Sequence, residues 1–449
     1  MADNLLQSTQ YSINQLAVIT KSGEVIDIST SFVQLNICDS VFVPVMNGSI
    51  TVIDSVGLSE FLNFDGSEVL LVDFGKFEDG TTSFKKSFRI RKMTNRRNLN
   101  PSTLSYDLHF VSDELIYSDQ RKVNQKYTDT YSNIVAKILS DYLYLPTFAG
   151  IFTPSSGIKS VVIPDLSPLD AIQWCTNRAV DENLGPNFIF YENIIGYNFT
   201  SLSNILTKDS ILDIKFFPKN LNNTDALDEV SSPRYFEVIS NPDVMRRTRQ
   251  GVNSGKYAIF DPVTRVMGHI DEEKTVNYLD HYQTVKHGND TPLFSGMVNR
   301  DNTNNFEQYE ARRSFGFSGK PRQASSYIKK KDPTSLNTID NQEDFVFQRR
   351  AIIENLISKR LKMVMPGNFE LSSGFNVNVM APIYGKPENE DETVTGKYLI
   401  VASKHILDIR GKFETVVEAA TTSTDIGYIQ GSTAAVSKAA VEYEDDYLR

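Results

Sequence analysis

The chain has only two cysteines, Cys38 and Cys175, which excludes a disulfide framework and a zinc site built from several thiolates. Positive charge is also scarce, because 46 Lys and Arg face 56 Asp and Glu and leave a formal net charge of −10. Proteins that hold nucleic acid through its phosphates usually have a basic surface. The composition of the whole chain therefore argues against that class.

Long apolar runs are missing as well. No stretch approaches the roughly 18 consecutive apolar residues that a membrane-spanning helix needs. The first 20 residues show no basic segment followed by an apolar run, so we expect no secretory signal. We therefore expect the chain to be made and folded in a cytoplasm.

The sequence also lacks the residue patterns of common catalytic and metal sites. His281 and His287 are six residues apart, which is not the spacing of two zinc ligands on one helix face. His109 and His405 fall on or beside alternating strands, where we expect surface or packed imidazoles. No Gly-x-Ser-x-Gly elbow occurs, and the segment from Gly316 to Lys320 lacks the spacing and the hydroxyl residue of a P-loop. We predict no enzyme, no metal site and no cofactor.

Two charged runs have simple explanations. Carboxylates cluster between Pro387 and Gly396, at Glu388, Glu390, Asp391 and Glu392. Paired carboxylates can hydrolyse glycosides, but no aromatic residue stands among these to hold a sugar, so we expect a solvated turn. The three consecutive lysines at 329–331 are expected to be solvated or to contact an acidic partner.

What the chain does contain is enough apolar and aromatic material for folded domains. Hydrophobic residues make up 40% of its 449 residues, and 27 Phe and 20 Tyr dominate the aromatics. Aromatic residues favour strands, and a chain of this length typically folds as roughly three domains. We therefore expect a mainly β protein with several units.

The first 113 residues carry strand signals. The runs 41–46 and 50–53 flank Asn47-Gly48, a dipeptide typical of a two-residue hairpin turn with positive φ angles. Alternating strands are predicted at 67–74, 86–93 and 104–111, which indicates a sheet with one buried face.

Residues 114–204 have the pattern of a small α+β unit. A helical period opens at Thr128, and Ser167-Pro168-Leu169-Asp170 predicts a capped helix start. That helix is expected to end before Gly185. A hairpin is then predicted from 188–193 and 196–199.

Strand signals return in the second half of the chain. A hairpin is predicted at 256–270, a long polar segment over 286–344, a helix over 345–363, and strands at 375–381, 396–403 and 412–420. The last 25 or so residues resemble a loosely held acidic tail.

The two β regions share an order of parts, because in each a hairpin precedes three strands. Two antiparallel meanders can look alike by chance. The alternative that we favour is a duplicated small β-barrel. The predicted units are a first barrel from 1–113 with 205–235, an α+β domain at 114–204, a second barrel from 236–285 with 365–425, an insertion at 286–364, and a tail at 426–449.

Several segments together resemble the baseplate hub proteins of contractile-tailed bacteriophages. They are the run from Val41 to Gly48, the residues Asp54-Ser55 and Gly66-Ser67-Glu68, the run from Ser167 to Trp174, the run from Asn187 to Asn193, and the residues Gly396 to Ile400 with His405 and Phe413-Glu414-Thr415. The likeness covers most of residues 30–420. The polar 286–344 segment and the acidic tail depart from a minimal hub.

The resemblance implies a mainly β fold with two tail-tube-like antiparallel β-barrels per chain and smaller α+β domains. It implies a homotrimeric structural subunit of the virion tail, which joins a six-fold tail tube to a three-fold central spike. Partners would be a tail tube or tube-initiator protein, the spike, and baseplate wedge and tape-measure proteins. Genome DNA would pass through the channel without specific binding.

On this reading the 41–54 hairpin lies at the tube or trimer interface, through Val43, Val45, Asn47, Gly48, Ile50 and Val52. Two other functions remain open from the sequence. One is a carbohydrate-binding or cell-wall-hydrolysing tail component, which an aromatic-lined cleft with two facing carboxylates would indicate. The other is the hub-spike protein of a phage-derived injection or secretion machine.

Overall fold

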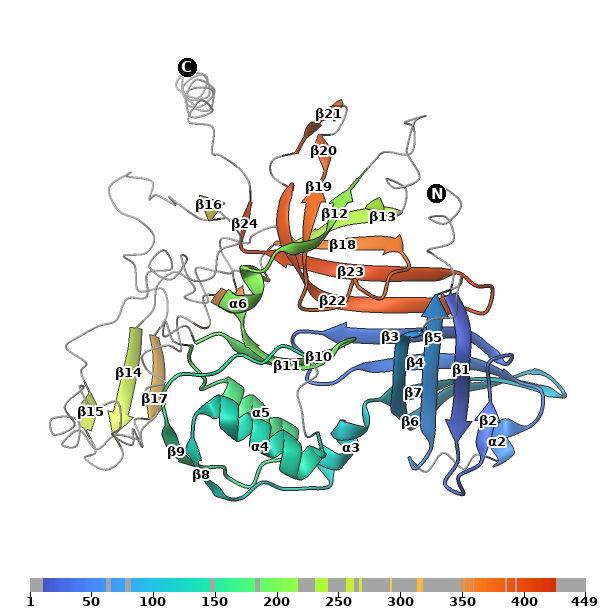
Figure 1. Ribbon diagram of the computed structural model, residues 1–449, viewed down its shortest axis with the longest axis horizontal. Helices are drawn as coiled ribbons and strands as arrows, with labels where there is room; N and C mark the ends of the chain where they lie inside the picture. Colours follow the sequence, from blue (N-terminus) through green and yellow to red (C-terminus); the bar gives the residue numbers. More distant parts are fainter. Residues whose placement is uncertain are drawn as a thin grey trace, which may run out of the picture.

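A computed structural model describes most of the chain, with one large sheet at its centre (Figure 1). The described residues are 11–61, 66–76, 82–145, 150–181, 186–216, 231–240, 256–261, 266–268, 291–292, 313–317, 349, 352–354, 356–357, 359–383, 386–391 and 394–424. The predictions for the lysines at 329–331, for His281 and His287, for most of the 286–344 segment and for the tail lie outside these residues.

The first half of the sheet comes from the N-terminal part of the chain. Its strands are β1 (Tyr11–Ile19), β2 (Val25–Asp27), β3 (Phe32–Ser40), β4 (Asn47–Asp54), β5 (Val69–Lys76), β6 (Thr82–Asn100) and β7 (Thr103–Val111). They lie in the order β3-β4-β7-β6-β5-β1-β2. Alternate residues face one core, which includes Phe74, Phe88 and Phe110, as the period-two pattern predicts. The short helix α2 (Leu58–Phe61) follows β4.

The second half uses strands that are far apart in the sequence. They are β12 (Ser210–Lys215), β13 (Tyr235–Ser240), β18 (Lys359–Pro366), β19 (Asn376–Met380), β22 (Gly396–Asp408) and β23 (Phe413–Thr421). These strands pack around a separate core that includes Leu361, Met363, Tyr398 and Ile400. The two halves meet where β22 pairs antiparallel with β3, from Ala402 opposite Ser40 to Asp408 opposite Gln34.

The strand order of the first half is repeated in the second. Spatially, the series β1-β5-β6-β7-β4-β3 corresponds to β12-β19-β22-β23-β18-β13, and the chain visits the strands in the same sequence in both. One orientation differs, because β1 is antiparallel to β5 whereas β12 is parallel to β19. The halves form one continuous sheet, and no pairing among the described residues closes either half into a barrel of its own.

The hairpin predicted at 256–270 is not the counterpart of the first hairpin. Strand β14 (Lys256–Asp261) pairs with β15 (Val266–Gly268) as predicted, but both belong to a separate three-stranded sheet with β17 (Arg313–Phe317). In the large sheet the place of β3 and β4 is taken by β13 and β18. The helix predicted over 345–363 also ends early, because residues 349, 352–354 and 356 are helical whereas β18 begins at Lys359.

The hairpin predicted from strands at 41–46 and 50–53 is wrong both in its first strand and in its turn. Strands β3 and β4 pair with Cys38 opposite Asn47, so the connecting loop is residues 41–46. Asn47 and Gly48 are the first residues of β4, and neither has a positive φ. Gly48 is needed for a different reason: a Cβ there would lie 2.2 Å from the backbone oxygen of Asn36 and 2.4 Å from Cζ of Phe110.

The α+β unit packs beside the first half of the sheet (Figure 1). Its elements are α3 (Asp113–Asp119), β8 (Lys126–Asp129), α4 (Tyr131–Leu143), β9 (Lys159–Val162), α5 (Pro168–Thr176), β10 (Phe188–Asn193), β11 (Gly196–Ser201) and α6 (Leu202–Leu206). The predicted cap of α5 is confirmed, because Ser167 Oγ accepts a hydrogen bond from the Asp170 N–H. Helix α4 starts later than predicted, with Thr130 as its cap.

Small two-stranded pairings complete the described part. Strand β20 (Pro382–Ile383) pairs with β21 (Lys386–Glu390), and β16 (Thr291–Pro292) pairs with β24 (Ser423–Thr424). Among the described residues no helix has the length and apolarity to cross a bilayer.

Candidate functional site: the junction of the sheet halves and the α+β unit

The loop of residues 41–46 lies where the parts of the molecule meet. Val41 donates its backbone N–H to Val401 of the second half, at 2.9 Å. Val45 is buried in the core of the α+β unit, whereas Met46 belongs to the core of the first half. Phe42 and Val43, at the tip, are 46% and 37% exposed. One short loop thus holds the parts together and presents an apolar tip to solvent.

The six residues predicted to form an interface do not share one environment. Val43 and Asn47 are exposed, so both are available to a partner. Val45, Ile50 and Val52 are buried in cores, and Gly48 lies against the Phe110 ring. Phe42 is exposed beside Val43 but was not among the predicted residues; an aromatic residue two positions before Pro44 was the available signal.

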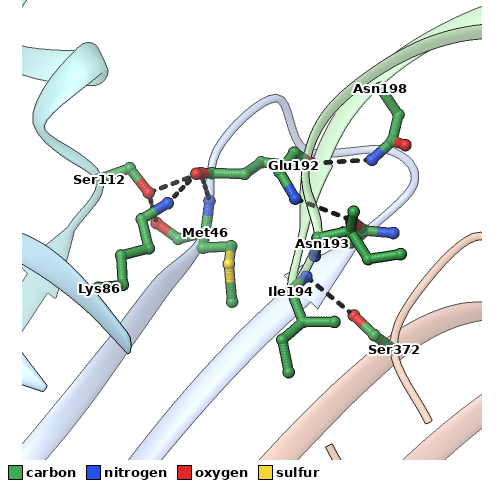
Figure 2. A network of polar contacts seen from close by, with 10 residues as sticks. Met46, Lys86, Ser112, Glu192, Asn193, Ile194, Asn198 and Ser372 are labelled. Carbon is green, nitrogen blue, oxygen red and sulfur yellow. Dashed lines mark hydrogen bonds and ion pairs between the residues drawn. The ribbon is translucent and has the colours of Figure 1, made fainter. Parts of the chain in front are cut away.

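A buried carboxylate fixes the α+β unit to the first half of the sheet. Glu192, on β10, accepts hydrogen bonds from the backbone N–H of Met46 at 2.7 Å and from Ser112 Oγ at 2.6 Å (Figure 2). It also forms an ion pair with Lys86 of β6. Burial lowers the pKa of Lys86 to about 8, against the opposing effect of Glu114 and Asp113. The ion pair therefore joins two elements through charges that are largely removed from water.

The turn after β10 reaches the second half of the sheet. Asn193 donates from Nδ2 to the backbone oxygen of Ser373 at 3.0 Å, and the Ile194 N–H donates to Ser372 Oγ at 3.3 Å (Figure 2). Residues 192–194 thus contact both halves of the sheet within three positions. The β10–β11 hairpin acts as a clamp between them.

A second buried carboxylate lies at the seam between the halves. Asp39 of β3 accepts hydrogen bonds from Ser372 Oγ, Ser403 Oγ and the Ser373 N–H. Burial raises the pKa of Asp39 to about 6, although these hydrogen bonds favour its charged form. Hydrogen bonds from serine hydroxyl groups to a buried carboxyl group therefore bridge the seam.

His405 continues this seam network but does not complete a catalytic triad. Its Nε2 lies 3.3 Å from Ser403 Oγ, and its Nδ1 lies 3.2 Å from Thr415 Oγ1. In a triad the imidazole stands between the acid and the serine, whereas here Ser403 stands between Asp39 and His405. All three are buried, and burial lowers the pKa of His405 to about 3. This arrangement stabilises the seam and offers no accessible nucleophile. The packed imidazole expected for His405 is what the structure contains.

Within the described residues, no group of three or more His, Cys, Asp or Glu side chains is arranged to hold a metal ion. The predicted carboxylate cluster lies on and after β21, where only Asp391 has a described side chain; it lies close enough to Lys359 to raise the pKa of that lysine, against the larger lowering effect of burial. The site is therefore a junction made of packing and buried hydrogen bonds.

Comparison with known proteins identifies the fold. No protein-family model matches the chain, and no curated protein matches it in sequence. Among solved structures, the chain is similar to the tail protein from Neisseria meningitidis MC58, with a TM-score of 0.50, 9% identity, and coverage of 92% of this chain and 96% of that one. It is equally similar to the 43 kDa tail protein of prophage MuSo2 from Shewanella oneidensis, with a TM-score of 0.50, 9% identity, and coverage of 91% and 99%. The chain therefore has, over nearly its whole length, the fold of these two tail proteins.

Proposed function

We propose that the chain is a structural subunit of a phage-type tail, located in the virion baseplate. The observation that carries this proposal is the whole-length similarity in fold to two tail proteins. The similarity covers more than nine-tenths of each chain, so it concerns the arrangement of all the units rather than one common module. The proposal includes no catalytic role.

We further propose that the subunit is a hub that adapts a six-fold tube to a three-fold spike. The repeated strand order supports this role, because each chain contributes two halves built on one plan. Three such chains in a closed ring would present six similar elements around one axis. On this proposal the halves act as two tail-tube-like barrels once neighbouring copies cover their edges, and genome DNA passes through the centre.

The junction fits a structural subunit whose parts keep one relative arrangement. The Glu192 and Asp39 networks connect the α+β unit and both sheet halves through buried polar contacts, which fix one relative arrangement. The exposed tip at Phe42 and Val43 is then the proposed contact with the tube or the neighbouring copy.

Electron microscopy and mass photometry of the purified full chain test the hub proposal. We expect three-fold rings with a central hole, formed alone or after addition of tube and spike proteins from the same genome. Phe42→Ser with Val43→Ser should weaken ring formation, whereas Val25→Ser, at another exposed valine, should not. A chain that stays monomeric with all these partners present would overturn the hub role. Digestion of cell-wall material in a zymogram would overturn the non-catalytic part.

A further inference from the structure

The hairpin formed by β6 and β7 has a net positive charge, whereas the whole chain has a net negative charge. Residues 82–111 contain seven Lys or Arg and one acid, Asp107, although the entire chain carries a net charge of −10. An average over the whole sequence hides this local excess. Surface potential, rather than net charge, determines what a given face attracts.

The basic residues concentrate on one edge of the sheet. Strand β6 has 19 residues, of which 82–89 pair with β5, whereas 89–100 pair with β7. Beyond Ile90, whose N–H reaches Glu68, no described strand pairs with the other side of β6. We call the four exposed cations of this part, Arg91, Lys92, Arg96 and Arg97, the basic edge.

The cations of the basic edge are not neutralised by ion pairs within the described part of the chain. The other three basic residues differ: Lys85 pairs with Asp73, Lys86 with Glu192 and Arg89 with Asp113. Asp107 accepts hydrogen bonds from Thr51 Oγ1 and Asn95 Nδ2, each at 2.6 Å. Burial raises the pKa of its carboxyl, but these bonds, with the nearby charge of Arg97, lower that pKa by more. A strand rises about 3.3 Å per residue, so four cations lie within about 20 Å.

The chemistry around these cations fits a phosphate backbone better than a protein. Protein–protein interfaces concentrate aromatic and apolar anchors at their centre. The β6–β7 hairpin has one exposed large apolar residue, Leu99, while Asn95, Asn98 and Asn100 add exposed amides. Protein–DNA interfaces are more polar and much more positive, and Arg suits bidentate phosphate contacts.

We propose that the basic edge binds double-stranded DNA through its phosphates, without reading the sequence. The proposal does not rest on the tail role, because it follows from this edge alone. Charges and bulges on an edge strand also prevent pairing with another sheet. Charge of either sign serves that purpose, so charge reversal separates protection of the edge from DNA binding.

The second half supplies a matched control. The β22–β23 hairpin is the counterpart of β6–β7 in strand order, and its tip carries Arg410 and Lys412. Lys412 is paired with Glu414 at 2.9 Å. Reversal of these two charges changes the net charge of the chain by the same amount as reversal at Arg96 and Arg97. It does so in the equivalent hairpin of the second half of the sheet.

The test is fluorescence anisotropy of a labelled DNA duplex with the full chain, from 50 to 200 mM salt. If up to four phosphates are neutralised, the affinity should fall on the order of 100-fold over this range. Arg96→Glu with Arg97→Glu should weaken binding at 50 mM salt by at least 100-fold. Arg410→Glu with Lys412→Glu should change it by less than about threefold, apart from the shared effect of net charge.

Three results would overturn the proposal: no binding at 50 mM salt, binding independent of salt, or equal losses in both double variants. If the Arg96 and Arg97 variant instead changes the mass of the assembly in mass photometry while the unmodified chain binds no DNA, the edge contacts protein. Should that variant fail to fold by circular dichroism, Arg91→Gln with Lys92→Gln is measured instead, with an expected loss of about tenfold or more.

Discussion

The two halves of the sheet share a strand order but differ in how they are held together. The first half is made from one continuous stretch, Tyr11 to Val111, whereas the second collects strands from Ser210 to Thr421 around long intervening segments. The α+β unit is fixed to the first half through the buried Glu192–Lys86 pair. The second half joins the first through the β22–β3 ladder and through neutral hydroxyl groups that donate to Asp39.

The two halves also differ in whether their surface cations form ion pairs. In the second half, Arg360 pairs with Glu418 and Arg234 pairs with Glu414, at 2.8 and 2.9 Å. In the first half the basic edge has no such pairs in the described part. A repeated backbone plan can therefore carry two different surfaces, because strand order depends on core-facing residues while outward residues are free to change. Substitutions in the two halves test this contrast.

Glu192→Ala should lower the free energy of unfolding by about 3–5 kcal/mol. The change leaves the Lys86 ammonium, the Met46 N–H and Ser112 without their shared acceptor in the interior. Urea unfolding measures the loss. Glu192→Gln keeps an acceptor oxygen and should cost less, and combining Glu192→Leu with Lys86→Met should recover part of the alanine loss. Equal losses from all three variants would contradict a role for the charge.

Asp39→Asn should change how stability depends on pH. The pKa of Asp39 is raised from 3.8 to about 6, so between these values the folded chain keeps a proton that the unfolded chain releases. Its contribution to the free energy of unfolding is therefore complete below about pH 4 and is lost as the pH rises through 6. The difference in free energy of unfolding between the unmodified chain and the variant should change by up to about 3 kcal/mol over this window.

His405→Gln gives the opposite sign at the same seam. The pKa of His405 is lowered from 6.5 to about 3, so its contribution is complete above pH 6.5 and is lost as the pH falls through 3. Urea midpoints at several pH values distinguish the two variants. Parallel curves for both variants and the unmodified chain would show that neither group titrates in the folded seam.

Gly48→Ala should cost about 1–3 kcal/mol, and Gly48→Val more. The new Cβ meets the backbone oxygen of Asn36, which cannot move without disturbing the β3–β4 ladder. Gly367→Ala, just after β18, would bring its new Cβ to 2.1 Å from Cγ and 2.6 Å from Cβ of the buried Phe413, so a loss of similar size is expected. Thermal unfolding compares the variants; an unchanged melting temperature for Gly48→Ala would contradict the close approach at this position.

Glu418→Ala should cost less than about 1 kcal/mol, because its pair with Arg360 is partly open to solvent. Added salt should reduce even this difference. The same urea assay provides the measurement. A loss as large as that of Glu192→Ala would contradict the contrast between buried and exposed pairs.

Local features of the structure could be predicted from the sequence because their causes are local. The alternation in β5, β6 and β7, the Ser167 cap and the β10–β11 hairpin each depend on residues within a few positions. The turn at Asn47-Gly48 was the exception, since the glycine there accommodates the Phe110 ring, 62 positions along the chain. The prediction that the 256–270 hairpin is the counterpart of the first hairpin is wrong for the same reason, because distant contacts decide which strands pair.

The sequence by itself determined a mainly β chain, two β regions that share an order of parts, and a likeness to phage tail proteins, because the apolar pattern of each strand is local to the sequence. Only the tertiary structure decided which strands form the second half, where Glu192 and Asp39 lie, and where four cations without an ion pair in the described part of the chain gather. The Asp39 hydrogen bonds join residues 333 and 364 positions apart. Such contacts depend on how the whole chain packs, which no short stretch of sequence specifies.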